Sequence, residues 1–215
     1  QRLLSIADVE YFVLDEADLM LAMGFIDDVK KIERLCPETK QTLLFSATIP
    51  FKSEELANTI LKNPERIDVT PTKSVAKDVS QALYYVPKRN KIELCLHLLR
   101  NTVEGNVLIF RRTKYGVDKL EETLLKNGFS VNSIHGDKAQ SERQTALNKF
   151  KNGYVKVLIA TDVAARGIDV SNLTHVINFG LPQDNESYVH RIGRTGRAGT
   201  KGISLSIIEP SEQSR

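Results

Sequence analysis

The most constraining feature of this 215-residue sequence is an alternation of short apolar runs, rich in β-branched residues, with longer amphipathic stretches of helical period. Short continuous apolar runs are typical of strands buried on both faces of a sheet, and the stretches between them are typical of helices that cover it. The alternation therefore predicts an α/β fold in which helices flank parallel sheets.

Nine runs have the length and composition of strands. They are Tyr11–Leu14, Thr42–Phe45, Arg66–Val69, Ala82–Val86, Val107–Phe110, Ser130–Ile134, Val155–Ala160, His175–Phe179 and Ile203–Ile207. Three other stretches gather apolar residues on one helical face. They are Lys91–Leu99 through Ile92, Leu96 and Leu99, Tyr115–Lys126 through Val117, Leu120, Leu124 and Leu125, and Ser141–Lys151 through Ala146, Leu147 and Phe150.

A polar stretch without apolar period, Thr70–Ser80, is the expected boundary between two units. We expect residues 1–70 to be part of one domain, residues 71–78 to be a linker, and residues 79–215 to be a nearly complete domain and the stable core. The first part has too few strands for a parallel sheet covered on both faces. Four of its apolar side chains would then be exposed, those of Phe12, Leu14, Leu43 and Phe45.

The two parts differ in charge. Residues 1–71 carry 8 basic and 13 acidic side chains, a net charge of −5, whereas residues 72–215 carry 22 basic and 14 acidic side chains, a net charge of +8. A basic surface attracts polyanions, of which nucleic acid is the commonest. The asymmetry indicates two units with different partners.

The composition also bears on location. No apolar run approaches the roughly 20 residues that span a bilayer. The two cysteines, Cys36 and Cys95, lie far apart without metal-ligand spacing, and they indicate reduced thiols packed as small apolar side chains. We expect a cytoplasmic protein that does not associate with membranes.

An acidic cluster, Asp15-Glu16-Ala17-Asp18, follows the first predicted strand directly. Ligands bind open α/β sheets at the carboxyl ends of their strands. In nucleoside triphosphatases an Asp at this position holds Mg²⁺, and a neighbouring Glu can orient the attacking water. The alternative is an acidic loop at a helix start, where the helix dipole favours Asp and Glu. Ser46-Ala47-Thr48 ends the next strand, and its hydroxyls can hydrogen-bond the neighbouring carboxylates, although an ordinary turn would also use Ser and Thr.

The strongest local pattern is His190–Arg197, in which Arg191, Arg194 and Arg197 recur every three residues. On a helical start these arginines would project to one side. Guanidinium groups bind phosphate oxygens in forked pairs and stabilise a phosphoryl group in transfer. The alternative is a basic helix that faces solvent or nucleic acid.

Three further loops leave predicted strands at their carboxyl ends. They present Thr113, Gly136 and Thr161, with Arg111, Arg112, Arg143 and Arg166 nearby. Amides, hydroxyls and arginines on one rim suit a sugar-phosphate backbone, which they would grip without reading its sequence.

In order along the chain, six segments resemble motifs II, III, IV, IVa, V and VI of DEAD-box RNA helicases. They are Asp15–Asp18, Ser46–Thr48, Phe110–Thr113, Gln140–Arg143, Thr161–Asp169 and His190–Arg197. The family is built from RecA-like domains, so the resemblance implies the end of a first domain with motifs II and III and a second domain with the rest. Within the family, Tyr84–Arg100 and His135–Arg143 are most similar to the bacterial RhlE-type branch.

The resemblance also implies roles for individual residues, with ATP, Mg²⁺ and RNA as ligands. Asp15 would hold Mg²⁺ and Glu16 would position water. Arg194 and Arg197 would be arginine fingers on the γ-phosphate. The ATP contacts would further include Gly167, Asp169 and His190. Coupling between the domains would involve Asp18, Ser46, Thr48, His190 and Arg191. The RNA backbone would be bound by Arg111, Arg112, Thr113, Gly136, Gln140, Arg143, Thr161 and Arg166.

The departures from the family pattern shape the functional expectation. The sequence contains no Gly-x-x-x-x-Gly-Lys-Ser/Thr loop, and it stops at Arg215 where the family usually continues into a further helix. We expect an ATP-hydrolysing RNA helicase in the intact parent and an inactive fragment in this chain alone, with protein partners or self-association through the exposed first unit. Two alternatives remain, a non-enzymatic RNA-binding module and a DNA-directed helicase of the same superfamily.

Overall fold

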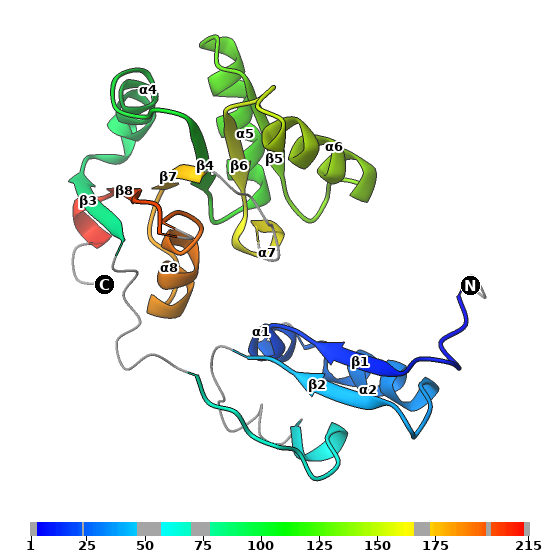
Figure 1. Ribbon diagram of the computed structural model, residues 1–215. Helices are drawn as coiled ribbons and strands as arrows, with labels where there is room; N and C mark the ends of the chain where they lie inside the picture. The colour runs from blue at the N-terminus through cyan, green and yellow to red at the C-terminus, as the bar shows by residue number, and fades with distance from the viewer. Residues whose placement is uncertain are drawn as a thin grey trace. The chain divides into compact units, whose positions relative to one another are not determined.

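The computed structural model of the chain describes residues 4–22, 24–46, 57–69, 78–165, 173–196 and 199–212. The chain divides into two compact units, residues 1–72 and residues 73–215 (Figure 1). Each unit has its own sheet. None of the helices in the described ranges is long and apolar enough to cross a membrane.

Unit 1 contains a two-stranded parallel sheet and the helices that connect its strands. Its described elements are β1 (Tyr11–Leu14), α1 (Ala17–Ala22), α2 (Ile26–Leu35), β2 (Gln41–Leu44) and a helical turn at 57–60. The two strands pair from Tyr11 opposite Gln41 to Leu14 opposite Leu44. A small core of Leu14, Val29 and Ile60 forms where one face of this sheet meets α2 and the helical turn.

The two faces of the unit 1 sheet differ in burial. Because side chains alternate along a strand, Leu14 points into the core and is buried, while Val13 is 51% exposed. Tyr11 and Phe45 are exposed as well. The expectation of a strand buried on both faces is therefore wrong for β1. The expected exposure is confirmed for Phe45 but wrong for Leu14, because α2 covers that face.

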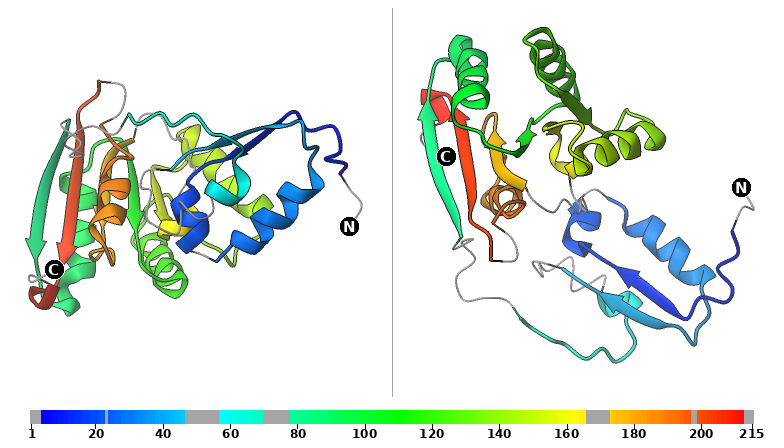
Figure 2. Two further views of the ribbon diagram at one scale, coloured as in Figure 1. Left: turned by 90° about the horizontal axis from the view of Figure 1, so that it is seen from below. Right: turned by 45° about the horizontal axis from the view of Figure 1, so that its top comes forward.

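Unit 2 is built on a six-stranded, wholly parallel sheet in the order β3-β8-β7-β4-β6-β5. Its strands are β3 (Val79–Tyr85), β4 (Asn106–Phe110), β5 (Val131–Ile134), β6 (Val157–Ala160), β7 (Leu173–Asn178) and β8 (Gly202–Ile208). Its helices are η1 (Lys88–Asn90), α4 (Lys91–Asn101), α5 (Lys114–Lys126), α6 (Gln140–Lys151), α7 (Asp162–Ala165), α8 (Asn185–Ile192) and η2 (Pro210–Glu212). Figure 2 shows the first and last strands of the unit, β3 and β8, side by side.

Helices cover both faces of the unit 2 sheet. In β4, Val107 and Ile109 pack with α4 and α5 in one core cluster, whereas Leu108 and Phe110 pack with α6 and α7 in another. The same alternation in β8 directs Leu205 and Ile207 toward α4 and α5. This arrangement confirms the predicted parallel α/β sheet flanked by helices.

One detail of the sequence expectation is wrong. The predicted strand Arg66–Val69 lies in a described segment that forms neither helix nor strand, and Ile67 and Val69 are exposed with no strand beside them to pair with. A β-branched run without a pairing partner does not become a strand. In α4, Ile92 and Leu96 are half-buried and pack against the core cluster that contains Leu99, as expected, and Lys91, Cys95 and Leu98 are buried as well.

Burial of His175, which is only 3% exposed on β7, lowers the pKa of its imidazole below the ordinary value. Its Nδ1 lies 2.9 Å from Thr174 Oγ1, and its Nε2 has no hydrogen-bond partner among the described residues. In the unfolded chain a histidine takes up a proton near about pH 6.5. The unfolded state therefore binds more protons than the folded state below that pH, and stability falls as the pH decreases toward the lowered folded-state pKa.

We predict that replacing His175 with Phe flattens this dependence. Urea unfolding of the chain between about pH 7 and about pH 5 should give a smaller loss of unfolding free energy in His175→Phe than in the wild type. The exposed His97 provides the control, and His97→Gln should retain the wild-type slope. An equal slope in His175→Phe would contradict the prediction.

Candidate nucleotide and nucleic-acid site

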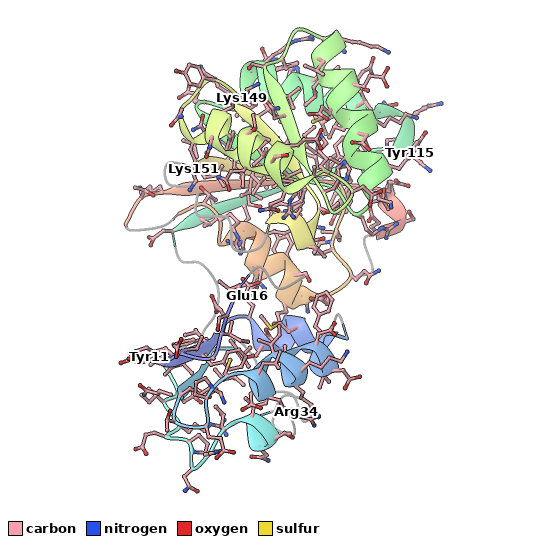
Figure 3. All side chains as sticks on the ribbon, turned by 90° about the vertical axis from the view of Figure 1, so that its right-hand side faces the viewer. Tyr11, Glu16, Arg34, Tyr115, Lys149 and Lys151 are labelled. Carbon is pink, nitrogen blue, oxygen red and sulfur yellow. The ribbon has the colours of Figure 1, made fainter. Side chains whose placement is uncertain are left out.

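The acidic cluster of unit 1 lies in a turn directly after β1, where Figure 3 labels Glu16. Glu16 has a φ of +52°, in the left-handed region that side chains other than glycine rarely adopt. The turn is held by backbone hydrogen bonds to the neighbouring strand, from Ala17 N–H to Phe45 O at 3.0 Å and from Phe45 N–H to Leu14 O at 2.7 Å. Strained backbone of this kind concentrates at functional sites and persists when its surroundings enforce it.

The Ser46 hydroxyl connects the two predicted motifs of unit 1. Its Oγ accepts a hydrogen bond from the backbone N–H of Asp18 at 3.3 Å. The structure thus brings Asp18 and Ser46 together, but this bond joins the hydroxyl to the Asp18 backbone and not, as expected, to a carboxylate. Thr48, the other expected partner, lies outside the described residues.

The Asp15 carboxylate is exposed, and its Oδ1 accepts a hydrogen bond from Glu16 N–H at 2.9 Å. Within the described ranges, no three His, Cys, Asp or Glu side chains gather closely enough to hold a metal ion together. Mg²⁺ commonly binds through one or two carboxylates together with substrate phosphates and water. A single exposed Asp fits that manner of binding.

In unit 2, Thr113, Gly136 and Thr161 follow the carboxyl ends of β4, β5 and β6. These three strands are neighbours in the sheet and run parallel, so the three residues lie along one edge. Thr113 also caps α5, because its Oγ1 accepts a hydrogen bond from Gly116 N–H at 3.1 Å. A Cβ placed on Gly136 would meet no atom within 4 Å, so its backbone is open to approach.

The two arginines after β4 differ in burial. Arg111 is half-buried, lies 4.4 Å from the centre of the Phe179 ring and donates from Nε to Gly116 O at 3.2 Å. Burial lowers the pKa of its guanidinium. Arg112 is exposed. The expected pair of RNA-binding arginines therefore separates into one turned inward and one that faces solvent.

The first turn of α6 presents Gln140 and Arg143. Arg143 Nη1 donates to Gln140 Oε1 at 3.2 Å, whereas Arg143 Nε is buried without a hydrogen-bond partner in the described part of the chain. A buried guanidinium nitrogen without a hydrogen-bond partner destabilises the protein unless a ligand supplies the missing acceptor. The two residues lie next to each other, as the predicted motif requires.

Arg191 forms the densest polar cluster of unit 2. Its guanidinium makes a forked pair with Asp162, from Nε to Oδ1 at 2.5 Å and from Nη2 to Oδ2 at 2.8 Å. Nη1 donates to Asn178 Oδ1 at 3.3 Å and to Gly180 O at 3.1 Å. The group also lies 5.0 Å from the centre of the Phe110 ring. Arg191 is 2% exposed, so these internal partners replace the water that its guanidinium has lost.

Arg191 and Arg194 line the same hollow, but they are not aligned on one helix as expected, and Arg197 lies outside the described residues. The helix α8 ends at Ile192, and Gly193 caps it. Arg191 is still within the helix and points into the sheet, while Arg194 follows the helix end. A spacing of three residues aligns side chains only while the helix continues.

His190 and Arg194 line one small hollow together with Asp162. The remaining lining residues are Phe110, Ala165, Ser187 and Arg191. The predicted motifs V and VI, far apart in sequence, thus meet at the face of the sheet covered by α7 and α8.

Two glycines fix the chain after this hollow. Gly196 has a φ of +67°, and a Cβ on it would lie 2.7 Å from Val79 Cγ2. A Cβ on Gly202 would lie 2.5 Å from the Gly196 nitrogen. Glycine is required where backbones approach this closely, so Thr195 and Gly196 are held against the starts of β3 and β8.

Several expected site residues lie outside the described residues. They are Thr48, Arg166, Gly167, Asp169 and Arg197. Three residues that build the described cluster were not assigned a role from sequence, namely Asp162, Asn178 and Phe110. Asp162 had a usable signal, because a carboxylate directly after a buried strand lies at the ligand-binding edge. Phe110 begins the segment that resembles motif IV but was given no role, and Asn178 was marked only by its place in an apolar strand.

Comparisons with known proteins match both units. The family described as DEAD/DEAH box helicase matches residues 1–57, and the family described as Helicase conserved C-terminal domain matches residues 90–199. A protein of Bacillus cereus named DEAD-box ATP-dependent RNA helicase CshA is 46% identical over 212 residues, which cover 99% of this chain and 40% of that protein.

Solved structures of DEAD-box proteins are also similar to this chain. A DEAD box protein from Methanococcus jannaschii is 44% identical, with a TM-score of 0.61 over 98% of this chain and 57% of that chain. The Saccharomyces cerevisiae protein Dbp5 bound to RNA and ADP BeF3 is 32% identical, with a TM-score of 0.82 over 97% of this chain and 55% of that chain.

The fold and the motif-bearing strand ends define a RecA-like α/β protein. The chain belongs to the DEAD-box helicase family, and it spans about 40% of the length of the curated relatives it matches. The finer expectation of an RhlE-type branch is wrong, since these relatives are named CshA. Similarity in Tyr84–Arg100 and His135–Arg143 did not separate the branches, because such short segments share the fold constraints of the whole family.

We predict that Arg191→Lys destabilises unit 2. Lysine keeps the charge but cannot form the fork, which leaves Asp162, Asn178 and Gly180 short of donors in a buried site. The free energy of unfolding, measured with urea, should fall by about 2–3 kcal/mol.

The control is Arg100→Lys on the exposed side of α4, where Arg100 donates to Asn127 at 3.4 Å. It should change stability by less than about 0.5 kcal/mol. Equal unfolding midpoints for Arg191→Lys and the wild type would show that the fork contributes nothing.

Proposed function

We propose that these 215 residues work in an ATP-dependent RNA helicase that couples ATP binding and hydrolysis to RNA binding and local duplex unwinding. The observation that carries the proposal is the 46% identity, over nearly the whole chain, to a protein named DEAD-box ATP-dependent RNA helicase. The geometry supports it at three places: the strained turn at Glu16, the shared edge of Thr113, Gly136 and Thr161, and the hollow lined by His190 and Arg194.

On the nucleotide side, Asp15 would hold Mg²⁺ and Glu16 would orient the attacking water. When bound, Mg²⁺ neutralises charge on the phosphate oxygens. The left-handed turn leaves the Asp15 carboxylate exposed directly after β1. Arg194, placed after the end of α8, would reach the γ-phosphate, and His190 beside it would contact the nucleotide or Asp18. Arg197, Gly167 and Asp169 keep the nucleotide roles that the family resemblance implies.

On the nucleic-acid side, the ligand is a sugar-phosphate backbone. Thr113, Gly136 and Thr161 offer hydroxyls and amides along one sheet edge, and Arg112, Gln140 and Arg143 add donors beside it. Such donors contact phosphates and sugars, which carry no sequence information directly. The binding should therefore discriminate poorly between RNA sequences.

We expect the chain to bind single-stranded RNA with strong salt dependence. Each phosphate contact that is lost reduces the slope of log affinity against log salt by about 0.7 for a single strand. Arg143→Gln should weaken binding and reduce the slope by about that amount, as measured by fluorescence anisotropy. Lys149→Gln, an equal loss of charge at the exposed far end of α6, should have a much smaller effect.

RNA and DNA strands of the same base sequence should be compared in the same assay. Tighter binding to RNA supports the proposal, whereas a preference for DNA favours the DNA-directed alternative. A strong preference among RNA sequences at fixed salt would contradict backbone recognition.

We further predict that Arg194 acts in turnover. The test protein is a chimera in which the amino-terminal part of the Bacillus cereus relative precedes this chain. Arg194→Ala should reduce RNA-stimulated ATP hydrolysis by about 10³-fold or more while binding of a fluorescent nucleotide changes little, because a finger acts in the transition state. Lysine should restore little of the activity.

The matched control for turnover is Arg100→Ala, which removes an exposed arginine from α4 and should keep wild-type activity. If the chimera is active and Arg194→Ala hydrolyses ATP at a near-normal rate, Arg194 is not a finger. A chimera that binds RNA without hydrolysing ATP would favour the non-enzymatic alternative.

A further inference from the structure

The loop between β5 and α6 contains Gly136, whose backbone is accessible. One face of α5 presents charged side chains to this loop. Lys114, Asp118 and Glu121 follow one another at intervals of four and three residues, so they lie on one side of the helix. We refer to these three residues as the α5 polar stripe.

Each residue of the α5 polar stripe pairs with a different residue of the loop or of β5. Lys114 Nζ lies 2.6 Å from Asp137 Oδ2, and this hydrogen bond lowers the pKa of the Asp137 carboxyl. Asp118 Oδ1 lies 2.9 Å from His135 Nε2. Glu121 Oε2 accepts from Lys138 Nζ at 3.1 Å and from Ser133 Oγ at 2.6 Å. The titratable side chains on both sides of Gly136 are thus bound to one helix.

His135 is the buried member of this set, since it is 5% exposed. Its Nδ1 accepts a hydrogen bond from the backbone N–H of Asp137 at 3.3 Å. An imidazole nitrogen that accepts carries no proton, so the hydrogen of the neutral ring is on Nε2 and is donated to Asp118. The ring therefore links α5 to the backbone on the far side of Gly136.

We infer that His135, oriented by Asp118, is a positioning residue for RNA. It fixes the Gly136–Asp137 backbone at the sheet edge where Thr113 and Thr161 also lie. The inference rests on the proposed RNA binding by this edge, and it adds a residue that itself is too buried to contact RNA. An arrangement fixed before binding avoids the cost of ordering the loop on binding.

Two conservative substitutions separate the two bonds of the ring. In His135→Asn, the side-chain oxygen can still accept from the Asp137 amide, but the side chain no longer reaches Asp118. In His135→Gln, the side-chain amide can still donate to Asp118, but the acceptor near Asp137 is lost. His97→Gln, which removes an exposed histidine from α4, is the matched control.

The test measures the affinity of the 215-residue chain for a short fluorescein-labelled oligouridine. We expect His135→Gln to bind about fivefold more weakly than the wild type and His135→Asn to stay within about twofold, as the loss of one hydrogen bond implies. His97→Gln should bind as tightly as the wild type.

A second readout does not depend on RNA. Hydrogen exchange of the Asp137 amide, followed by NMR, should be faster in His135→Gln than in the wild type and in His135→Asn. Unchanged exchange in His135→Gln would overturn the inference, as would equal affinities in all four proteins. Absence of RNA binding by the wild type would instead overturn the proposed function, and this inference with it.

Discussion

The forked pair between Arg191 and Asp162 is the interaction on which the rest of unit 2 depends. A guanidinium that is 2% exposed has lost its hydration, which is tolerable only when nearly every donor finds a partner. Arg191 makes four hydrogen bonds, to Asp162, Asn178 and Gly180. Asn178 in turn donates to Ser206 at 3.1 Å, so the network extends into β8. One side chain thereby ties α7, α8, β7 and β8 together.

The placement of the candidate nucleotide residues follows from this network. Because Arg191 anchors the last turn of α8, His190 and Arg194 are held on either side of it, next to Asp162. Gly196 and Gly202 then hold the following segment against the start of β3. The end of α8 is thus held on one side by Arg191 and on the other by the close backbone approach at Gly196. This restricts the directions in which Arg194 can point. Preorganisation of this kind is what allows a donor to act on developing charge without reorganising.

The sequence predicted the fold well because apolar strands and amphipathic helices can be recognised from short stretches of sequence. The run Val107–Phe110 is apolar on both sides, and the structure packs its two sides into two different core clusters. Parallel strands then place Thr113, Gly136 and Thr161 on one edge without further information. The direction of Arg191 was not predictable in the same way. It depends on where α8 ends and on Asp162, 29 residues earlier in the chain, and neither follows from a spacing of three.

Burial also distinguishes among the cations of unit 2. Lys91 and Arg111 lie near the same Phe179 ring, at 5.5 Å and 4.4 Å, and burial lowers the pKa of both groups. Lys91 further lies 3.6 Å from Glu212, so its charge is compensated inside the unit. Lys91 and Arg111 already have partners inside the unit, so they have few donors left to bind a phosphate. Arg112 is exposed and Arg143 retains a buried Nε without a partner in the described chain. A basic composition therefore becomes a binding surface only through the few cations that the fold does not already use.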